Sequence, residues 1–407
     1  MSVGRALYPP PPPWSRALPT VGVTGTNGKT TTTAWIAAAL RAGTGAPVVR
    51  ATTVGVFVDD EPLDVPATYD GFLAAMRAGL DRGGRAAAIE LTSEALAAGF
   101  ATAWPVRTGV FTNLTHDHLD AHGSPEHYLA SKAQLFVHLP ADGAAVLNGR
   151  DPVWSLLAEV LPRGVRAIFY GAPGRGGGEG DAPLDLEALR VEPAWSGTEL
   201  TLRAPAEWNA PVTLRVRAIG EVYAENALAA LAGAVAAGVP AEVAAEAIAA
   251  APPPPGRFEV VAERPYLVVD YAHSPDALER VVRTAKRIAS GRVTVVFGAG
   301  GDRDRGKRAP MGRAARAADR VIVTTDNPRR EDPAAIAAAI RAGLEGHPGT
   351  ETILDRGEAI ALAVRDAGPD DVVLVAGRGH EAEQIFADGP RPFSDVAVLR
   401  ALADRRA

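Results

Sequence analysis

The stretch TGTNGKTT, from Thr24 to Thr31, has residue types in an order that suits the binding of a phosphate chain. A glycine turn between a strand and a helix lets backbone N–H groups and the positive end of the helix point at an anion. Lys29 would then reach the terminal phosphates, and the Thr30 hydroxyl would bind Mg²⁺. The match to the standard phosphate loop is incomplete, because Val23 stands where that loop has glycine and Gly22 lies one residue early.

A glycine turn that holds no nucleotide is the alternative, but Gly-Lys-Thr at a strand–helix junction favours a nucleotide. The sequence therefore predicts that this loop binds the phosphates of ATP. The residues of the predicted ATP site in the loop are Gly25, Thr26, Asn27, Gly28, Lys29, Thr30 and Thr31.

A carboxylate, a group of histidines and aspartates, and a lysine could add to this site. Glu90 ends the run AAAIE, and α/β sheets bind ligands at the carboxyl ends of strands, although a carboxylate there could equally cap a neighbouring segment. Lys132 shares a helical face with Tyr128 and Phe136, which predicts partial burial; a lysine with a buried stem and an exposed amine is the alternative. THDHLDAH suits a transition metal by its spacing, but a polar loop with helix-capping aspartates is as common. Its polar residues are His116, Asp117, His118, Asp120 and His122.

Composition limits the classes of protein that need consideration. The chain has 407 residues, of which 47% are hydrophobic, so it can bury two or three domain cores. A formal charge of -6 without a long basic block argues against a nucleic-acid binder. The absence of cysteine excludes disulfides, thiolate nucleophiles and cysteine-ligated zinc. With no apolar run long enough for a bilayer and no signal region, we expect no membrane association and a cytoplasmic protein.

The elements that must position these residues follow an α/β pattern. From Val21 onward, β-branched runs alternate with Ala- and Leu-rich stretches, as in a parallel sheet covered by helices. Residues 184–219 alternate at period two and predict an antiparallel extension. After the APPPP run at 251–255, four strand-like runs, each followed by a helix-like segment, predict a second doubly wound domain.

The predicted fold class is therefore α/β, with a P-loop parallel-sheet ATPase domain followed by a Rossmann-like α/β domain. The predicted boundaries are a proline-rich tail at 1–19, the ATP-binding domain at 20–253 and the second domain at 254–407. GAGGDR also resembles a dinucleotide fingerprint, but Arg303 stands where the third glycine belongs, so that signal is weak.

TGTNGKTT is also the form that the loop takes in the Mur ligase family, the ATP-dependent enzymes that add amino acids to the peptidoglycan precursor. Five further stretches resemble this family in order and spacing, and the resemblance extends from Thr20 to the C-terminus. They are TNLTHDHLDAHGSPEHYLASKAQLF, VVDYAHSPDALERV, VFGAGGDRDRGKRAPMG, TTDNPRREDPAAI and VLVAGRGHEAEQ. Together they look like the member that adds the third residue of the peptide, and DNPR resembles the form that selects meso-diaminopimelate over lysine.

The resemblance implies a carboxylate–amine ligase that uses ATP and Mg²⁺ and forms an amide through an acyl phosphate. It implies a carbamylated Lys132, whose new carboxylate would hold a second Mg²⁺ together with Glu90; burial favours the neutral amine that carbamylation requires. His118 would contact Mg²⁺, supported by Asp120. The implied catalytic residues are Lys29, Glu90, His118 and Lys132, and the implied metal ligands are Thr30, Glu90, His118 and Lys132.

The resemblance also implies that Asn226 and Arg257 hold ATP together with Asp270, so that the nucleotide would bridge both domains. A helix cap for Asn226 and an ion pair with Glu259 for Arg257 are the alternatives. Arginine binds carboxylates bidentately and glutamate accepts from ammonium, which suits an amino-acid site, although DNPR alone is an ordinary turn sequence. The implied amino-acid-binding residues are Arg303, Asp326, Asn327, Arg329, Gly377 and Glu381.

The sequence departs from the family where the acceptor should bind. Family members carry a UDP-sugar-binding domain before the phosphate loop, whereas nineteen residues precede Thr20, so we expect that domain to be lacking or supplied by a partner chain. Glu94, Ala98 and Phe100 replace a histidine, a glutamine and an arginine of the family, and Phe100 is expected to make the acceptor channel more apolar.

Three functions remain compatible with the sequence. The first, which is favoured, is a working ligase that joins a diaminopimelate-like amino acid to a carboxylate acceptor. Either its acceptor is not UDP-MurNAc-dipeptide, or another chain supplies the sugar-binding domain. The second is a non-catalytic or accessory subunit, which would be expected to have lost Lys29, Glu90 or Lys132; all three are present. The third is an amidotransferase subunit with a four-cysteine zinc ribbon, which a chain without cysteine does not support.

Overall fold

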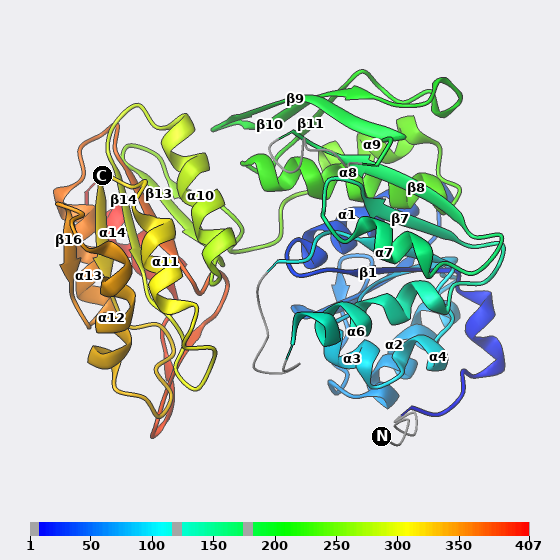
Figure 1. The fold of residues 1–407 in the computed structure, drawn as a ribbon, viewed down its shortest axis with the longest axis horizontal. Helices are drawn as coiled ribbons and strands as arrows, with labels where there is room; N and C mark the ends of the chain where they lie inside the picture. Colours follow the sequence, from blue (N-terminus) through cyan, green and yellow to red (C-terminus); the bar gives the residue numbers. More distant parts are fainter. Residues whose placement is uncertain (1–7, 116–123, 174–181, 407) are drawn as a thin grey trace. The chain divides into compact units, whose positions relative to one another are not determined.

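The computed structural model describes residues 8–115, 124–173 and 182–406. The chain divides into two compact units, which are considered separately below (Figure 1). The first unit consists of Met1–Glu192, Gly197–Arg217 and Val222–Pro252, and the second of Pro193–Ser196, Ala218–Glu221 and Pro253–Ala407.

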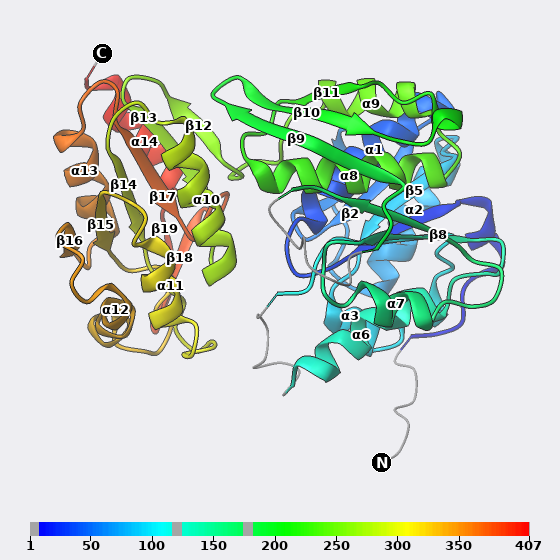
Figure 2. The same ribbon diagram turned by 45° about the horizontal axis from the view of Figure 1, so that its top comes forward.

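The first unit is built on one mixed sheet, which has eleven strands in the described part of the chain. Its central strands are parallel, and β10 and β11 extend it as an antiparallel pair (Figure 2). In sheet order the strands are β11 (Thr213–Val216), β10 (Gly197–Arg203), β9 (Leu186–Ala194), β8 (Arg166–Gly171), β7 (Ala144–Asn148), β6 (Thr108–Phe111), β1 (Thr20–Thr24), β5 (Ala86–Glu90), β2 (Val48–Thr52), β3 (Gly55–Val58) and β4 (Glu61–Pro62).

Helices cover both faces of this sheet. One face carries α1 (Lys29–Thr44), α8 (Glu221–Ala236) and α9 (Ala241–Ala250); Ile36 of α1 and Val110 of β6 both pack against Gly233 of α8. The other face carries α2 (Tyr69–Asp81), α3 (Ser93–Ala97), α4 (Phe100–Ala103), α6 (Pro125–Val137) and α7 (Trp154–Glu159), around a core that includes Trp104, Leu135 and Phe136 (Figure 1). A short 3-10 helix, η2 (Ala206–Trp208), lies between β10 and β11.

The segment before β1 packs on the first unit. It contains the 3-10 helix η1 (Pro13–Ala17), and the rings of Tyr8 and Trp14 lie against the core. The ring centroid of Tyr8 is 5.7 Å from that of Phe100, and the ring centroid of Trp14 is 5.7 Å from that of Trp104. The segment expected to be a tail is therefore packed from Tyr8 onward, because aromatic side chains flank its prolines and bury apolar surface.

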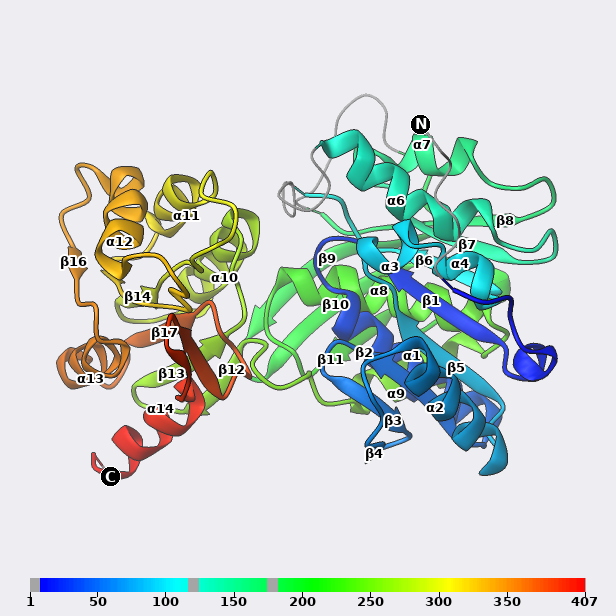
Figure 3. The same cartoon turned by 90° about the horizontal axis from the view of Figure 1, so that it is seen from below.

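The second unit contains a six-stranded sheet, counted over its described residues. In sheet order its strands are β12 (Glu259–Ala262), β13 (Tyr266–Asp270), β17 (Val372–Ala376), β14 (Val293–Phe297), β15 (Arg320–Val323) and β16 (Thr350–Thr352). All pairs are parallel except β12 with β13. Figure 3 shows α10 (Pro275–Ile288), α11 (Arg308–Ala315) and α12 (Pro333–Arg341) on one side and α13 (Arg356–Asp366) and α14 (Asp395–Asp404) on the other. A 3-10 turn, η3 (Ala342–Leu344), follows α12.

Local sequence sets the starts of several helices. Thr68 caps α2 by accepting a hydrogen bond from the Gly71 amide at 3.2 Å, and Ser274 caps α10 in the same way with proline at the first helical position. The predicted α/β class is confirmed in both units.

One expected element of the second unit is wrong. The fourth strand-like run, β17, is followed by a two-stranded hairpin, β18 (Glu383–Phe386) and β19 (Gly389–Pro392), before α14 begins. The loop of this hairpin is Ala387-Asp388, and Gly389, which begins β19, adopts a φ of 128° that glycine alone takes easily. No helix in the described parts of the chain is long and apolar enough to span a bilayer.

Candidate active site

The phosphate loop joins β1 to α1 and depends on two glycines with positive φ. Gly25 has a φ of 146° and Gly28 a φ of 85°. A Cβ on Gly25 would lie 1.9 Å from Thr112 Oγ1, and a Cβ on Gly28 would lie 2.1 Å from Asn226 Oδ1. Both positions therefore require glycine, and the buried Asn226 of α8 packs directly against the loop.

Asn113, which follows β6, holds the loop in place. Its carbonyl oxygen accepts from the Thr26 amide at 2.7 Å, and its side-chain Oδ1 accepts from the Asn27 amide at 2.9 Å. The Thr26 and Asn27 amides are thus used to hold the loop. The first turn of α1, which begins at Lys29, has no side-chain cap, so its backbone N–H groups remain available to bind phosphate oxygens. Asn113 is not among the predicted site residues; it lies two residues after the end of β6.

Lys29, Thr30 and Glu90 lie together where β1 and β5 end. The register places Glu90 opposite Val23, one strand from the loop. Glu90 Oε2 accepts from Thr30 Oγ1 at 2.9 Å, and Glu90 Oε1 lies 3.9 Å from Lys29 Nζ. Hydroxyl and carboxylate oxygens are the ligands that Mg²⁺ prefers, and the ammonium group suits a phosphate oxygen, so these residues fit a Mg²⁺–nucleotide complex.

Lys132 of α6 is buried and points at the loop. Its Nζ donates to the Gly25 carbonyl oxygen at 2.8 Å and lies 4.3 Å from the centre of the Tyr128 ring. The lysine is 1% exposed, so the alternative of an exposed amine is wrong. Tyr128 also donates to Thr26 Oγ1 at 3.2 Å, which ties α6 to the loop a second time. His118 and the neighbouring histidines and aspartates of 116–122 lie outside the described residues.

The second unit gathers its predicted residues at the carboxyl edge of its sheet. Asp270 ends β13 opposite Ala376 of β17, and Gly377 follows directly. The turn after β14 contains Arg303, and the turn after β15 contains DNPR. Parallel strands bring these turns to one edge, where α/β sheets bind ligands.

Asp270 and Arg257 form one side of this edge. Asp270 is buried and accepts from the amides of Phe258 and Ala272, both at 2.7 Å. Burial raises the pKa of Asp270, while the nearby Arg257 acts in the opposite direction. The Arg257 guanidinium lies 4.4 Å from the centre of the Tyr271 ring.

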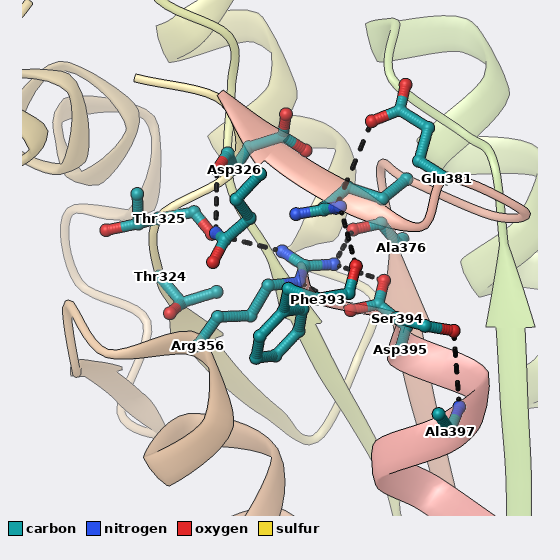
Figure 4. Close-up of polar contacts among 12 residues, drawn as sticks. Thr324, Thr325, Asp326, Arg356, Ala376, Glu381, Phe393, Ser394, Asp395 and Ala397 are labelled. Carbon is teal, nitrogen blue, oxygen red and sulfur yellow. Dashed lines mark hydrogen bonds and ion pairs between the residues drawn. The ribbon is translucent and has the colours of Figure 1, made fainter. Parts of the chain in front are cut away.

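The DNPR turn is closely connected to Glu381. Asn327 Nδ2 donates to Glu381 Oε2 at 2.9 Å, and Asn327 Oδ1 accepts from the Ile385 amide of β18 at 2.9 Å. A Cβ on Gly377, which has a φ of 113°, would lie 2.7 Å from Asp326 Oδ2. The turn, the residues after β17 and the hairpin thus form one connected structure, part of which Figure 4 shows around Asp326 and Glu381.

Two arginines lie over Gly300. A Cβ built on Gly300 would be 3.0 Å from Arg329 Nη1 and 3.7 Å from Arg303 Cγ. Arg329 is fixed, because its Nη1 donates to the Gly301 carbonyl oxygen at 2.9 Å, whereas Arg303 is exposed. Arg329 also acts electrostatically on Glu381. An arginine and a carboxylate arranged in this way can bind a group that carries both a carboxylate and an ammonium.

Phe100 does not line an open channel, which corrects the expectation for the acceptor site. It is 7% exposed, and its ring meets those of Tyr8, Tyr69 and Phe72 at centroid distances of 5.7, 6.0 and 5.1 Å. Phenylalanine at this position therefore contributes to packing of the first unit. No local pattern predicts that Tyr8, 92 residues earlier, would pack against it.

Two family models match the chain in the order that the two units follow. The Mur ligase middle domain matches residues 23–234, and the Mur ligase, glutamate ligase domain matches residues 256–379. The chain belongs to the Mur ligase family.

Individual Mur ligases match over nearly the whole chain. The UDP-N-acetylmuramoyl-L-alanyl-D-glutamate--2,6-diaminopimelate ligase of Streptomyces avermitilis is 39% identical, with 95% of this chain and 76% of that protein covered. The protein of the same name from Ralstonia nicotianae is 40% identical, with 97% and 77% covered. Among solved structures, a ligase of this name has a TM-score of 0.65 at 32% identity, covering 96% of this chain and 79% of that one.

A folylpolyglutamate synthase from Mycobacterium tuberculosis shares the fold at 20% identity and a TM-score of 0.71, with 96% of this chain and 91% of that one covered. As a Mur ligase, the protein is an ATP-dependent ligase that forms a carbon–nitrogen bond between a carboxylate and an amine.

Proposed function

We propose that this Mur ligase joins 2,6-diaminopimelate, or an amino acid with the same amino-carboxylate end, to a carboxylate acceptor. The observation that carries the amino-acid choice is the arrangement of Arg329, Asn327 and Glu381 on connected turns of the second unit. Arg329 and Arg303 would bind the distal carboxylate, and Glu381 would accept from the distal ammonium. Lysine has the ammonium but lacks that carboxylate, so it would leave both arginines without a partner.

The reaction follows from the donors of the first unit. An acceptor carboxylate oxygen attacks the γ-phosphorus of ATP, and the bond to the β,γ-bridging oxygen breaks, which yields ADP and an acyl phosphate. The amine nitrogen then attacks the acyl carbon, loses a proton, and phosphate leaves as the amide forms. Lys29 and the first-turn amides of α1 stabilise the negative charge on the phosphoryl oxygens in both steps.

Thr30 would hold one Mg²⁺, and Glu90 would hold a second together with the carboxylate of carbamylated Lys132; His118 is a further predicted Mg²⁺ ligand. The ions would supply charge neutralisation on the phosphates. We also propose that Asn226 of the first unit is an ATP-binding residue, and that Arg257 and Asp270 of the second unit are ATP-binding residues, as the family resemblance implies.

Lys132 is proposed to be carbamylated. Its burial and its distance of 2.8 Å from the Gly25 carbonyl oxygen support a role at the loop. Lys132→Ala should abolish turnover, whereas Lys286→Ala, which removes an exposed lysine paired with Asp319, should leave it unchanged. Added bicarbonate or a short carboxylic acid should partly restore the Lys132→Ala enzyme. Turnover at the wild-type rate in Lys132→Ala would refute this role.

For the acceptor, we propose a carboxylic acid whose recognition does not depend on polar side chains at Ala98 and Phe100. The burial of Phe100 beneath Tyr8 and Tyr69 supports this, because that side chain is unavailable for contact with a sugar. The proposed function as a whole is tested by ADP formation with diaminopimelate and with lysine in parallel. ADP formation that is equal with lysine, or independent of any amino acid, would contradict it.

A further inference from the structure

Arg378, which lies between Gly377 and Gly379 after β17, is an unusual buried cation. Its side chain has no exposed surface. Nη2 donates to the carbonyl oxygens of Glu383 at 2.7 Å and Phe393 at 3.1 Å, both at the open end of the β18–β19 hairpin. Nε and Nη1 have no hydrogen-bond partner among the described residues. Because a buried charge with unpaired donors is unfavourable, its retention calls for a physical reason.

A second buried arginine nearby, Arg356, differs from Arg378 because it is paired with a carboxylate. Arg356 donates to both oxygens of Asp395 at 2.7 and 2.8 Å, and both side chains have no exposed surface. It also donates to the Ala376 carbonyl oxygen at 3.0 Å (Figure 4). The charge of Arg356 is thus balanced by Asp395, whereas Arg378 has no such bidentate partner within the described chain.

The carboxylate nearest to the unpaired face of Arg378 is Glu381. Arg378 Nε lies 4.0 Å from Glu381 Oε2, which is the same oxygen that accepts from Asn327 Nδ2. The charged groups that act on Glu381 are Asp326, Arg329, Arg356 and Arg378. Burial is the main cause that raises the pKa of Glu381; Asp326 also raises it, whereas Arg378 and Arg329 lower it. Arg356 is already paired with Asp395, and Arg329 would be engaged by the substrate carboxylate. In the occupied site, Arg378 would therefore be the cation that balances the charge of Glu381.

We propose that Arg378 is a positioning residue that keeps Glu381 ionised and in place, so that this carboxylate can accept from the ammonium group of the incoming amino acid. The inference rests on the proposed function. It assigns two effects to one side chain: Nη2 fixes the hairpin that carries Ile385, and the positive charge beside Glu381 offsets its burial. Arg378 itself, without exposed surface, does not contact the substrate.

The test compares Arg378→Met and Arg378→Lys with the wild-type enzyme at saturating ATP. The acceptor is UDP-MurNAc-dipeptide or, if it does not support ADP formation, the short peptide that does, and the diaminopimelate concentration is varied at each pH from 5.5 to 9. Arg391→Met is the matched control, because Arg391 lies on the same hairpin but is 58% exposed and pairs with Asp388. In Arg378→Met, KM for diaminopimelate should rise roughly tenfold or more while kcat changes by less than about threefold. The acidic limb of kcat/KM should move up by about one pH unit, because Glu381 without its cation binds a proton more readily.

Arg378→Lys keeps the charge but not the two Nη2 hydrogen bonds, so its acidic limb should stay at the wild-type pH even if its stability falls. Arg391→Met should leave both the limb and KM unchanged. The inference would be overturned if the acidic limb of the kcat/KM profile stayed at the wild-type pH in Arg378→Met, or if it moved in Arg378→Lys. Should Arg378→Met fail to fold, Arg378→Gln replaces it, because glutamine removes the charge but keeps an N–H donor for the hairpin carbonyls. An acidic limb displaced to higher pH in Arg378→Gln supports the inference, and an acidic limb at the wild-type pH overturns it. A wild-type enzyme without diaminopimelate-dependent ADP formation would instead overturn the proposed function and the inference with it.

Discussion

The Lys29 ammonium group lies 3.9 Å from the Glu90 carboxylate, and the other oxygen of that carboxylate accepts from Thr30 at 2.9 Å. Glu90 therefore connects to both side chains that would meet the phosphates and Mg²⁺. Its side chain is 3% exposed, so this arrangement is fixed by the packing of β5 beside β1.

Glu90→Gln should lower kcat on the order of 100-fold or more, because the amide removes a charge from the predicted Mg²⁺ site while keeping the shape. Glu61→Gln, at an exposed carboxylate paired with Arg82, is the control and should retain the wild-type rate. Steady-state ADP release measures both. A Glu90→Gln enzyme within a few-fold of wild type would show that Glu90 is a structural cap.

Gly28→Ala should raise the apparent Kd for ATP at least tenfold, since the new Cβ would lie 2.1 Å from Asn226 Oδ1 and displace the loop or the amide. Gly45→Ala is a matched control: Gly45 ends α1 with a φ of 62°, and a Cβ there meets nothing within 4 Å. That variant should lose about 1 kcal/mol of stability and bind ATP normally. Calorimetric titration with a non-hydrolysable ATP analogue separates the two effects.

Arg329→Ala should raise KM for diaminopimelate roughly tenfold to a hundredfold, as expected when one charge-assisted contact of about 1.5 to 3 kcal/mol is lost. Arg330→Ala removes the next arginine, which is 81% exposed and pairs with Asp302, and should change KM by less than about threefold. Equal effects of the two substitutions on KM would indicate that DNPR acts only as a turn.

Glu331 should contribute pH-dependent stability to the second unit. Hydrogen bonds from Arg308, followed by the Asp302 amide, lower its pKa from 4.5 to about 2. A carboxylate with a depressed folded-state pKa stabilises the protein above the unfolded-state value, and this contribution disappears as the pH falls from about 4.5 to about 2.

Glu331→Gln should therefore lower the free energy of unfolding by about 1–3 kcal/mol at pH 7. The difference in unfolding free energy between wild type and variant should become smaller below pH 4.5. Denaturant titrations at pH 7, 5 and 3.5 measure this, with Glu358→Gln as an exposed-carboxylate control in the same unit. A difference between wild type and Glu331→Gln that is constant across these pH values would contradict the assignment.

Local patterns predicted much of the phosphate site. The strand–glycine–helix order around Gly25 to Thr30 and the placement of Glu90 at a strand end both depend on residues close in sequence, and the parallel register then brings them together. Asn113 was missed because its hydrogen bonds to the loop span 86 residues and have no local signature.

The buried charges of the second unit likewise depend on contacts between distant segments, which local sequence patterns do not predict. Arg356 and Asp395 are 39 residues apart, and nothing in either helix predicts that they meet without exposed surface. The burial of Phe100 beneath Tyr8 likewise depends on a contact between segments that are distant in sequence. The Asp-Gly pair at 388–389 is a sequence signal for the hairpin after β17, but a helix was predicted directly after this strand instead.

Mass spectrometry of the reaction product tests the central claim most directly. The protein is incubated with ATP, Mg²⁺, diaminopimelate and a panel of carboxylic acids that includes UDP-MurNAc-dipeptide and short peptides. We predict stoichiometric ADP, phosphate and a new amide whose mass equals acceptor plus diaminopimelate minus water, formed with at least one acceptor and not when lysine replaces diaminopimelate. ADP release without any amide product, or an amide formed equally well with lysine, would contradict the account.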